Sequence, residues 1–227
     1  MNTGAHSLTN VHCRQRAGIY GGAFDPTHKA HVALAAAAVQ QLALDVLYII
    51  PTGQPWMKQR RLTAGPHRLA MARLAFDGVS QVHVDDCELQ RAGTTYTIDT
   101  LRELQARPAH MGQATDWFLV MGEDLLHTLP LWQRAEDLLR EMTVAVLARP
   151  DENESAGNTE KPLQPPAGVR AVPLHLPASP ISSTAIRQGL QQRAALTPHE
   201  RLAWLQTLVP PAVAQYIEDH HLYLTPH

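Results

Sequence analysis

The chain has 227 residues, of which 44% are hydrophobic and 18% charged, and its formal net charge is −2 at pH 7; this is the composition of one globular domain with a full core. The near-neutral charge argues against a broad basic surface for nucleic acid, and no apolar run approaches the ~20 residues that span a bilayer. The two cysteines, Cys13 and Cys87, exclude a disulfide framework or a structural zinc cluster and favour a cytoplasmic location.

The first sixteen residues are polar and lack the continuous apolar stretch of a signal peptide. We interpret residues 1–16 as a disordered extension or as a misassigned start. Residues 17–227 are then expected to form a single domain.

Apolar runs and helix-forming segments alternate from residue 17 to residue 147. Strands are expected at 18–20, 46–50, 82–84, 117–121 and 143–147, and continuous apolar character is typical of buried parallel strands. Helices are expected between them at 31–44, 66–76, 96–106 and 124–141, the last with an interruption at Pro130. This alternation predicts an α/β fold in which right-handed βαβ units surround a parallel sheet.

The composition changes after residue 150. Residues 151–168 are polar, rich in proline and without periodicity, so we expect a flexible surface insertion. A last strand is expected at 169–176, and a helical part follows from about residue 180, with helices at 180–193 and 211–220. Between these two helices, Thr197 begins another, because Pro198 and Glu200 complete the pattern of a capping box with proline at the first helical position.

The segment 18–31 reads GIYGGAFDPTHKAH, which is the order of a strand, a tight loop and a helix start. The first N–H groups of a helix and the positive end of its dipole attract an anion, and Gly21 and Gly22 let a ligand approach the backbone. The P-loop pattern GxxxxGK[ST] and the dinucleotide fingerprint GxGxxG are both absent from this segment. The segment therefore predicts an anion site of another type.

Two histidines, His28 and His31, stand three residues apart at this helix start and face the same side. Their imidazoles can donate hydrogen bonds to phosphate oxygens, and the anion would favour their charged form. The alternative interpretation is a helix cap and a surface residue. A metal-binding pair is disfavoured, because no third ligand lies at a recognisable spacing.

A second candidate anion site lies in the stretch SPISSTAIR at 179–187. Hydroxyl groups and free N–H groups at a helix start, with Arg187 one turn further on, are typical of phosphate binding. The alternative is an ordinary Ser/Thr cap with a solvated arginine.

These two stretches together resemble the nucleotidylyltransferase superfamily, whose signature is a GGxFDP-like loop followed by HxGH and a distant ISSTxIR motif. The matching positions of the first motif are Gly21, Gly22, Phe24, Asp25, Pro26, His28 and His31. Ala23 replaces the usual Ser or Thr, and Ala30 replaces the glycine of HxGH. The resemblance covers about residues 18–223 and implies a Rossmann-like doubly wound parallel sheet with C-terminal helices.

The same resemblance implies which residues bind ATP. The ISSTxIR motif grips the ATP phosphates from the side opposite the histidines, and an acidic residue after a later strand lies near the ribose. The implied ATP-binding residues are Gly21, Gly22, Ala23, Phe24, His28, His31, Gly122, Asp124, Ile181, Ser182, Ser183 and Arg187.

Three further stretches resemble the nicotinate-nucleotide adenylyltransferases within this superfamily. They are PWMK at 55–58, where Met57 replaces a frequent histidine, a TYT triplet at 95–97, where Thr95 replaces serine, and GED at 122–124 followed by LW at 131–132. The implied residues for nicotinate mononucleotide are Gly22, Lys58, Tyr96, Thr97, Leu131 and Trp132. The alternatives are core packing for Tyr96 and Trp132 and a helix N-cap for Asp124.

The resemblance implies transfer of AMP from ATP to nicotinate mononucleotide, which forms deamido-NAD and pyrophosphate. Positioning and charge stabilisation supply the catalysis of such a step, and the implied catalytic residues are His28, His31, Lys58 and Arg187. Mg²⁺ is expected to bridge phosphates, with no protein ligand named. The alternatives are nicotinamide mononucleotide or another phosphomonoester as acceptor, or a nucleotide-binding regulatory module. Small molecules, and neither nucleic acid nor membrane, are the expected partners of a monomer or homodimer.

Overall fold

The computed structural model describes residues 14–55, 61–147 and 163–225, and its centre is a six-stranded sheet in the order β4-β2-β1-β6-β7-β8. Every pair of neighbouring strands in this sheet is parallel. The strands are β1 (Gln15–Gly22), β2 (Val46–Pro51), β4 (Val82–Val84), β6 (Thr115–Gly122), β7 (Met142–Leu147) and β8 (Ala171–Leu174). The predicted α/β fold with a doubly wound parallel sheet is therefore confirmed.

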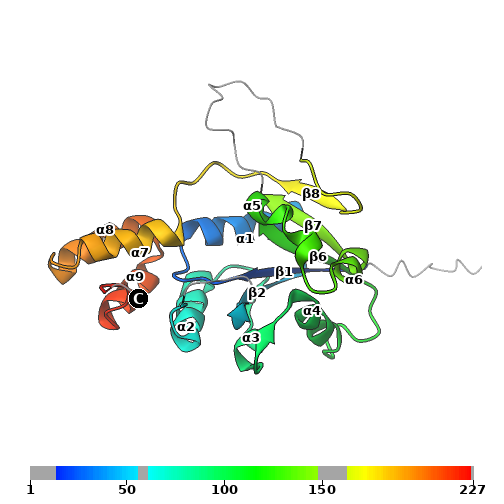
Figure 1. The fold of residues 1–227 in the computed structure, drawn as a ribbon, viewed down its shortest axis with the longest axis horizontal. Helices are drawn as coiled ribbons and strands as arrows, with labels where there is room; N and C mark the ends of the chain where they lie inside the picture. The colour runs from blue at the N-terminus through cyan, green and yellow to red at the C-terminus, as the bar shows by residue number, and fades with distance from the viewer. Residues whose placement is uncertain (1–13, 56–60, 148–162, 226–227) are drawn as a thin grey trace, which may run out of the picture.

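Helices alternate with the strands along most of the chain, and three helices follow the last strand. They are α1 (Lys29–Gln41), α2 (Gly65–Phe76), α3 (Cys87–Gln90), α4 (Thr97–Gln105), α5 (Glu123–Leu126), the 3-10 turn η1 (Leu129–Leu131), α6 (Ala135–Glu141), α7 (Ser183–Gln192), α8 (Pro198–Leu208) and α9 (Pro211–Asp219). Figure 1 shows α7, α8 and α9 together at one end of the molecule, beside α1. None of the helices in the described part of the chain is long and apolar enough to cross a membrane.

Alternating side chains of the central strands separate two hydrophobic clusters, because successive residues of a strand point to opposite faces of a sheet. Tyr20, Leu47 and Val120 belong to the first cluster, on the face of the sheet that α1, α2 and the C-terminal helices cover. Ile19 and Met121 belong to the second cluster, on the second face, which α3, α4, α5 and α6 cover. Both faces of the sheet are thus buried, which explains the continuous apolar runs in its strands.

The start of α8 shows how local sequence fixes an element. The N–H of Glu200 donates to Thr197 Oγ1 at 3.3 Å, and the N–H of Thr197 donates to Glu200 Oε2 at 2.9 Å. Pro198 occupies the first helical position, where its missing N–H costs nothing. The predicted capping box is confirmed.

Several predicted boundaries are wrong. The boundary at residue 17 is late, because Gln15 and Arg16 already belong to β1, and α1 begins at Lys29 rather than at residue 31. The expected helix at 124–141 is interrupted at Pro130, as predicted, by the 3-10 turn η1, and a further break that was not predicted occurs at Arg134, whose φ is 53° just before α6. Residues 1–13 and 151–162, expected to be flexible, lie outside the described residues; residues 163–168 form an irregular connection.

Candidate functional site

The predicted anion loop lies where the order of the strands reverses. β1 has β2 on one side and β6 on the other, and the chain reaches these two neighbours by crossovers on opposite faces. In doubly wound sheets, ligands bind in the crevice outside the carboxyl ends of the strands at this point. Gly21 and Gly22 end β1 there, and Gly122 ends β6. We call residues 21–28 the phosphate loop.

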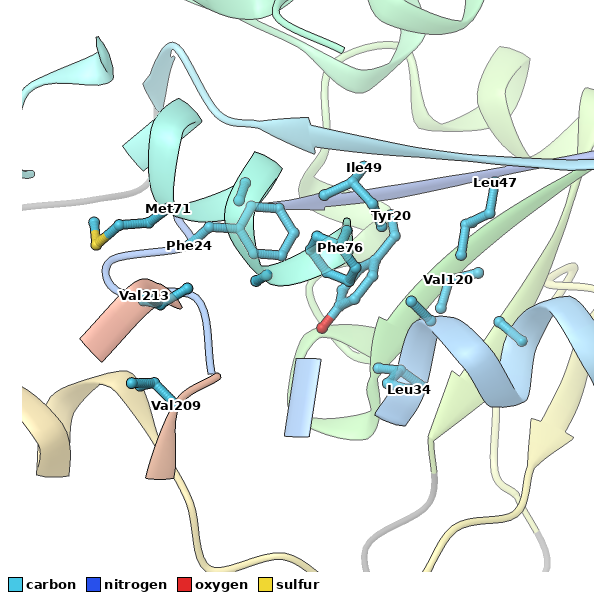
Figure 2. Close-up of a cluster of buried hydrophobic side chains, with 14 of the residues drawn as sticks. Tyr20, Phe24, Leu34, Leu47, Ile49, Met71, Phe76, Val120, Val209 and Val213 are labelled. Carbon is cyan, nitrogen blue, oxygen red and sulfur yellow. The ribbon is translucent and has the colours of Figure 1, made fainter. Parts of the chain in front are cut away.

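The phosphate loop is anchored through its aromatic residue. Phe24 is 1% exposed and lies with Tyr20 and Phe76 at ring-centroid distances of 5.4 and 6.1 Å. Figure 2 shows its ring pointing into the buried cluster that also holds Met71 of α2 and Val213 of α9. Its φ of 49° lies in the left-handed region, which is costly for a residue with a side chain. The packing therefore holds the loop in a conformation that it would not adopt alone.

The two histidines form a stacked pair at the start of α1. Their ring centroids are 3.6 Å apart with an interplanar angle of 20°. The backbone N–H of His28 donates to His31 Nδ1 at 3.1 Å. Because Nδ1 accepts this hydrogen bond, the neutral His31 ring carries its proton on Nε2, where it is a donor. The pair thus combines a helix cap with the facing imidazoles that phosphate binding needs.

Burial controls the charge of the first histidine. His28 is 5% exposed, its Nδ1 is buried without a hydrogen-bond partner, and burial lowers its pKa from 6.5 to about 4. The ring is therefore neutral at pH 7, which avoids two stacked cations. A ligand that carries negative charge would favour the protonated form of this ring and so raise its pKa.

This pKa predicts a pH dependence of folding stability. A histidine that is neutral when folded takes up a proton more readily when unfolded, so the free energy of unfolding falls as the pH falls from about 6.5 to 4, by about 1.4 kcal/mol per pH unit. Between pH 7 and pH 5, wild type should lose about 2 kcal/mol more than His28→Gln, measured by urea unfolding. Equal losses in the two proteins would contradict the assigned neutral state.

Helix α7 is hydrogen-bonded directly to the phosphate loop. Ser182 is its N-cap and accepts from the N–H of Ala185 at 3.2 Å. Ser183 Oγ donates to the carbonyl of Pro26 at 3.0 Å, and Arg187 Nη1 donates to the carbonyl of Asp25 at 2.7 Å. The two motifs, which are about 160 residues apart in the chain, therefore meet in space.

A buried arginine that the sequence analysis missed supports the other side of the loop. Arg68 of α2 is 3% exposed, and its Nη1 donates to the carbonyl of Ala23 at 3.0 Å, while its Nε donates to the carbonyl of Thr63 at 2.8 Å. In the sequence, this residue looks like a solvated charge within a helix. Ala23, the departure from the usual Ser or Thr, contributes its carbonyl here rather than a side-chain contact.

The candidate acceptor residues lie on the second face of the sheet. Tyr96 is the N-cap of α4 and packs half-buried against that face, and Thr97 is the first residue of α4. Glu88 is 7% exposed and accepts from Thr100 Oγ1 at 2.9 Å and from the N–H of Gly53 at 3.3 Å. This carboxylate joins α4 to the segment after β2, where β3 (Gln54–Pro55) and β5 (Thr94–Thr95) form a short parallel pair. Neither short strand was predicted.

Other residues of the candidate site follow β6. Gly122 is the N-cap of α5, so Asp124 is not the N-cap, and its side chain is exposed. Trp132 Nε1 donates to Thr128 Oγ1 at 3.0 Å, which fixes its half-buried ring against the second cluster. Leu131 is 69% exposed. Core packing therefore accounts for part of the Trp132 surface, whereas Leu131 belongs to neither hydrophobic cluster.

Lys58, with Met57, lies outside the described residues. Among the described residues, no group of three or more His, Cys, Asp or Glu could hold a metal ion. Ile181, the remaining predicted residue, is half-buried just before α7 and packs against the first cluster.

The chain is similar to known proteins over most of its length. A family model described as cytidylyltransferase-like matches residues 19–189. A protein of Albidiferax ferrireducens described as "Probable nicotinate-nucleotide adenylyltransferase" is 40% identical over 211 residues, which are 93% of this chain and 99% of that protein. A Bordetella pertussis protein with the same description is 36% identical over 217 residues, covering 92% of this chain and 98% of its own length.

A solved structure shares the fold. The nicotinic acid mononucleotide adenylyltransferase of Plasmodium falciparum, complexed with NaAD, superposes with a TM-score of 0.69 at 19% identity and covers 92% of this chain and 97% of its own. A second structure of that protein, complexed with APC, gives a TM-score of 0.67. At this identity, the likeness shows the Rossmann-like fold of these proteins and nothing finer.

Proposed function

Because the chain belongs to the cytidylyltransferase-like family and, within it, to the nicotinate-nucleotide adenylyltransferases, we propose that it transfers AMP from ATP to nicotinate mononucleotide. The products are deamido-NAD and pyrophosphate, and the reaction belongs to NAD biosynthesis. The observation that carries the proposal is the direct bonding of α7 to the phosphate loop at Asp25 and Pro26. These bonds hold the ISSTAIR helix start close to the loop that carries the stacked histidines, which supports a polyphosphate site with these two sides.

The chemistry needs no protein nucleophile. A phosphate oxygen of nicotinate mononucleotide attacks the α-phosphorus of ATP, a new P–O bond forms, and the bond to the bridging oxygen of the β-phosphate breaks. The electron pair leaves with pyrophosphate. The acceptor phosphate is already anionic at neutral pH, so the protein has to align two polyanions and stabilise the charge on the transferred and leaving groups.

The residues around the phosphate loop are suited to these tasks. His31 presents a neutral Nε2–H donor, and His28 offers a buried ring whose pKa an incoming anion would raise. We assign both to the oxygens of the α- and β-phosphates. Arg187, with its fork of donors, is assigned to the leaving pyrophosphate. Gly21 leaves the backbone open to the ligand, because a Cβ at this position would meet no atom within 4 Å.

We propose that Mg²⁺ arrives with ATP. The described residues offer no cluster of three ligating side chains, so phosphate oxygens and water would hold most of the ion's coordination sites. Bound there, the ion would neutralise phosphate charge. The assignments above do not depend on a protein ligand for it.

The open space at Gly21 gives a prediction with a matched control. Gly21→Ala should leave the free energy of unfolding within about 0.5 kcal/mol of wild type and weaken binding of a non-hydrolysable ATP analogue. Gly18→Ala should instead lower the free energy of unfolding by about 1–3 kcal/mol and leave the affinity for the analogue unchanged. The reason is that its Cβ would meet Leu47 Cδ1 at 2.7 Å and Leu44 Cδ1 at 2.8 Å. Urea unfolding and calorimetric titration measure the two effects; a stable Gly21→Ala protein with unchanged affinity would contradict this placement of the phosphates.

The proposed reaction is tested by pyrophosphate release from purified protein and MgATP with each acceptor in turn. We expect release with nicotinate mononucleotide at a kcat/KM well above that with nicotinamide mononucleotide. Release with another phosphomonoester only would overturn the acceptor assignment. Binding of the ATP analogue without turnover on any acceptor would favour a regulatory module. The cytoplasmic location and the monomeric or dimeric state stay predictions.

A further inference from the structure

The phosphate loop has a buried connection to the far end of the chain. Asp25 is 0% exposed and Tyr223 is 2% exposed. Tyr223 Oη donates to Asp25 Oδ1 at 2.7 Å across a sequence separation of 198 residues, and the N–H of Thr63 donates to Oδ2 at 3.4 Å. A buried carboxylate is costly unless such donors satisfy it. The hydroxyl of Tyr223 is the shorter of these two contacts.

Tyr223 itself, and the residue before Asp25, have unfavourable left-handed backbone conformations. Phe24, next to Asp25, has a φ of 49°, and Tyr223 has a φ of 65°. Left-handed residues with side chains persist only where the surroundings enforce them, and they gather at functional sites. Burial and the neighbouring Asp25 carboxylate raise the pKa of Tyr223, so its hydroxyl keeps its proton and remains a donor.

The part of the chain that carries Tyr223 is itself firmly attached. Tyr223 follows α9, and α9 is joined to α8 by the buried pair of Arg201 and Glu218, whose Nη2 and Oε2 atoms are 2.8 Å apart. Lys29 Nζ, at the start of α1, donates to the carbonyl of Gln206 at 2.8 Å. The C-terminal helices therefore form a fixed support beside the histidines.

Asp25 has a second role through its backbone. Its carbonyl accepts from Arg187 Nη1 at 2.7 Å, so a shift of Asp25 would turn the guanidinium that we assign to pyrophosphate. The same shift would act on His28, three residues along the loop. The side chain of Asp25 is thus the point at which Tyr223 can influence the ATP side of the site.

We propose that Tyr223 is a positioning residue for the ATP phosphates, acting through Asp25 on Arg187 and the phosphate loop. This inference rests on the proposed function in its assignment of the loop to ATP. Tyr223 lies in the first hydrophobic cluster with α1 and α2, whereas Tyr96 and Trp132 pack on the second. The effect should therefore fall on ATP and not on nicotinate mononucleotide.

The test compares Tyr223→Phe with Tyr216→Phe. Both remove one hydroxyl and keep the ring, and the Tyr216 hydroxyl contacts His67 Nδ1 at 3.0 Å instead of the phosphate loop. We expect Tyr223→Phe to raise the Kd of a non-hydrolysable ATP analogue about tenfold and to raise the KM for ATP, with the KM for nicotinate mononucleotide within twofold. Tyr216→Phe should leave all three within twofold of wild type.

An unchanged Kd for Tyr223→Phe would overturn the inference. An equal rise of both KM values together with a lower Tm would also overturn it, because that pattern is typical of a merely structural residue.

A double-mutant cycle tests whether Tyr223 acts through Asp25. In an Asp25→Ala background, Tyr223→Phe should weaken analogue binding no further, and a further tenfold loss would overturn action through Asp25. If Asp25→Ala does not fold, the first comparison decides. Analogue binding needs no turnover, so a failed acceptor assignment leaves this test intact.

Discussion

His31→Ala is expected to lower kcat by about 10³-fold, the cost of removing one well-placed donor to developing negative charge. The variant loses the Nε2–H donor and the ring that stacks on His28 at 3.6 Å, while alanine is a good helix former for α1. The circular dichroism spectrum should stay that of wild type. Steady-state release of pyrophosphate with MgATP and nicotinate mononucleotide measures the loss.

The control is His199→Ala, which removes an exposed imidazole from α8. Its kcat should stay within twofold of wild type. Turnover of His31→Ala above one tenth of the wild-type rate would remove this histidine from the catalytic residues.

Arg201→Ala should lower the free energy of unfolding by about 3–5 kcal/mol, because it leaves a charged carboxylate buried without its partner. Arg201 and Glu218 have side chains that are each 7% exposed, and two guanidinium nitrogens of Arg201 contact the Glu218 carboxylate. Arg140→Ala removes the pairs of an arginine that is 68% exposed, with Glu136 at 3.7 Å and with Asp137 at 2.8 Å, and should cost less than about 1 kcal/mol. Urea unfolding at pH 7 gives both values, and equal costs would contradict the role of burial.

The long elements of the fold could be predicted because their signals are local. The strand at 46–50 is an unbroken apolar run that ends at a proline, and the Thr197 capping box involves four neighbouring residues. The short strands β3 and β5 depend on pairing between residues 40 positions apart, and no local pattern marks a two-residue strand. The interruption of the helix at 124–141 by Pro130 could be predicted because proline breaks helices, whereas the second break depends on the left-handed conformation of Arg134, for which arginine gives no signal.

In the candidate site, too, the contiguous motifs could be predicted and the residues that support them could not. The loop at 21–28 and the helix start at 182–187 could be found because each is a contiguous motif, and family membership confirms the resemblance drawn from them. The residues that support the loop could not be found, since Arg68 and Tyr223 meet it only through tertiary packing. The roles of the individual residues toward substrate stay predictions.

The contact between Asp25 and Tyr223 also sets an order of events during protein synthesis. The six strands of the central sheet are all present once Leu174 has been added, so the sheet can form early on the growing chain. Tyr223 is added 49 residues after Leu174, so at about 5–20 residues per second the contact with Asp25 becomes available on the order of 2–10 s after the last strand. A nascent chain that already contains all six strands therefore still lacks the contact that we propose for ATP binding, and we expect newly made protein to gain affinity for ATP only when its last residues have been added.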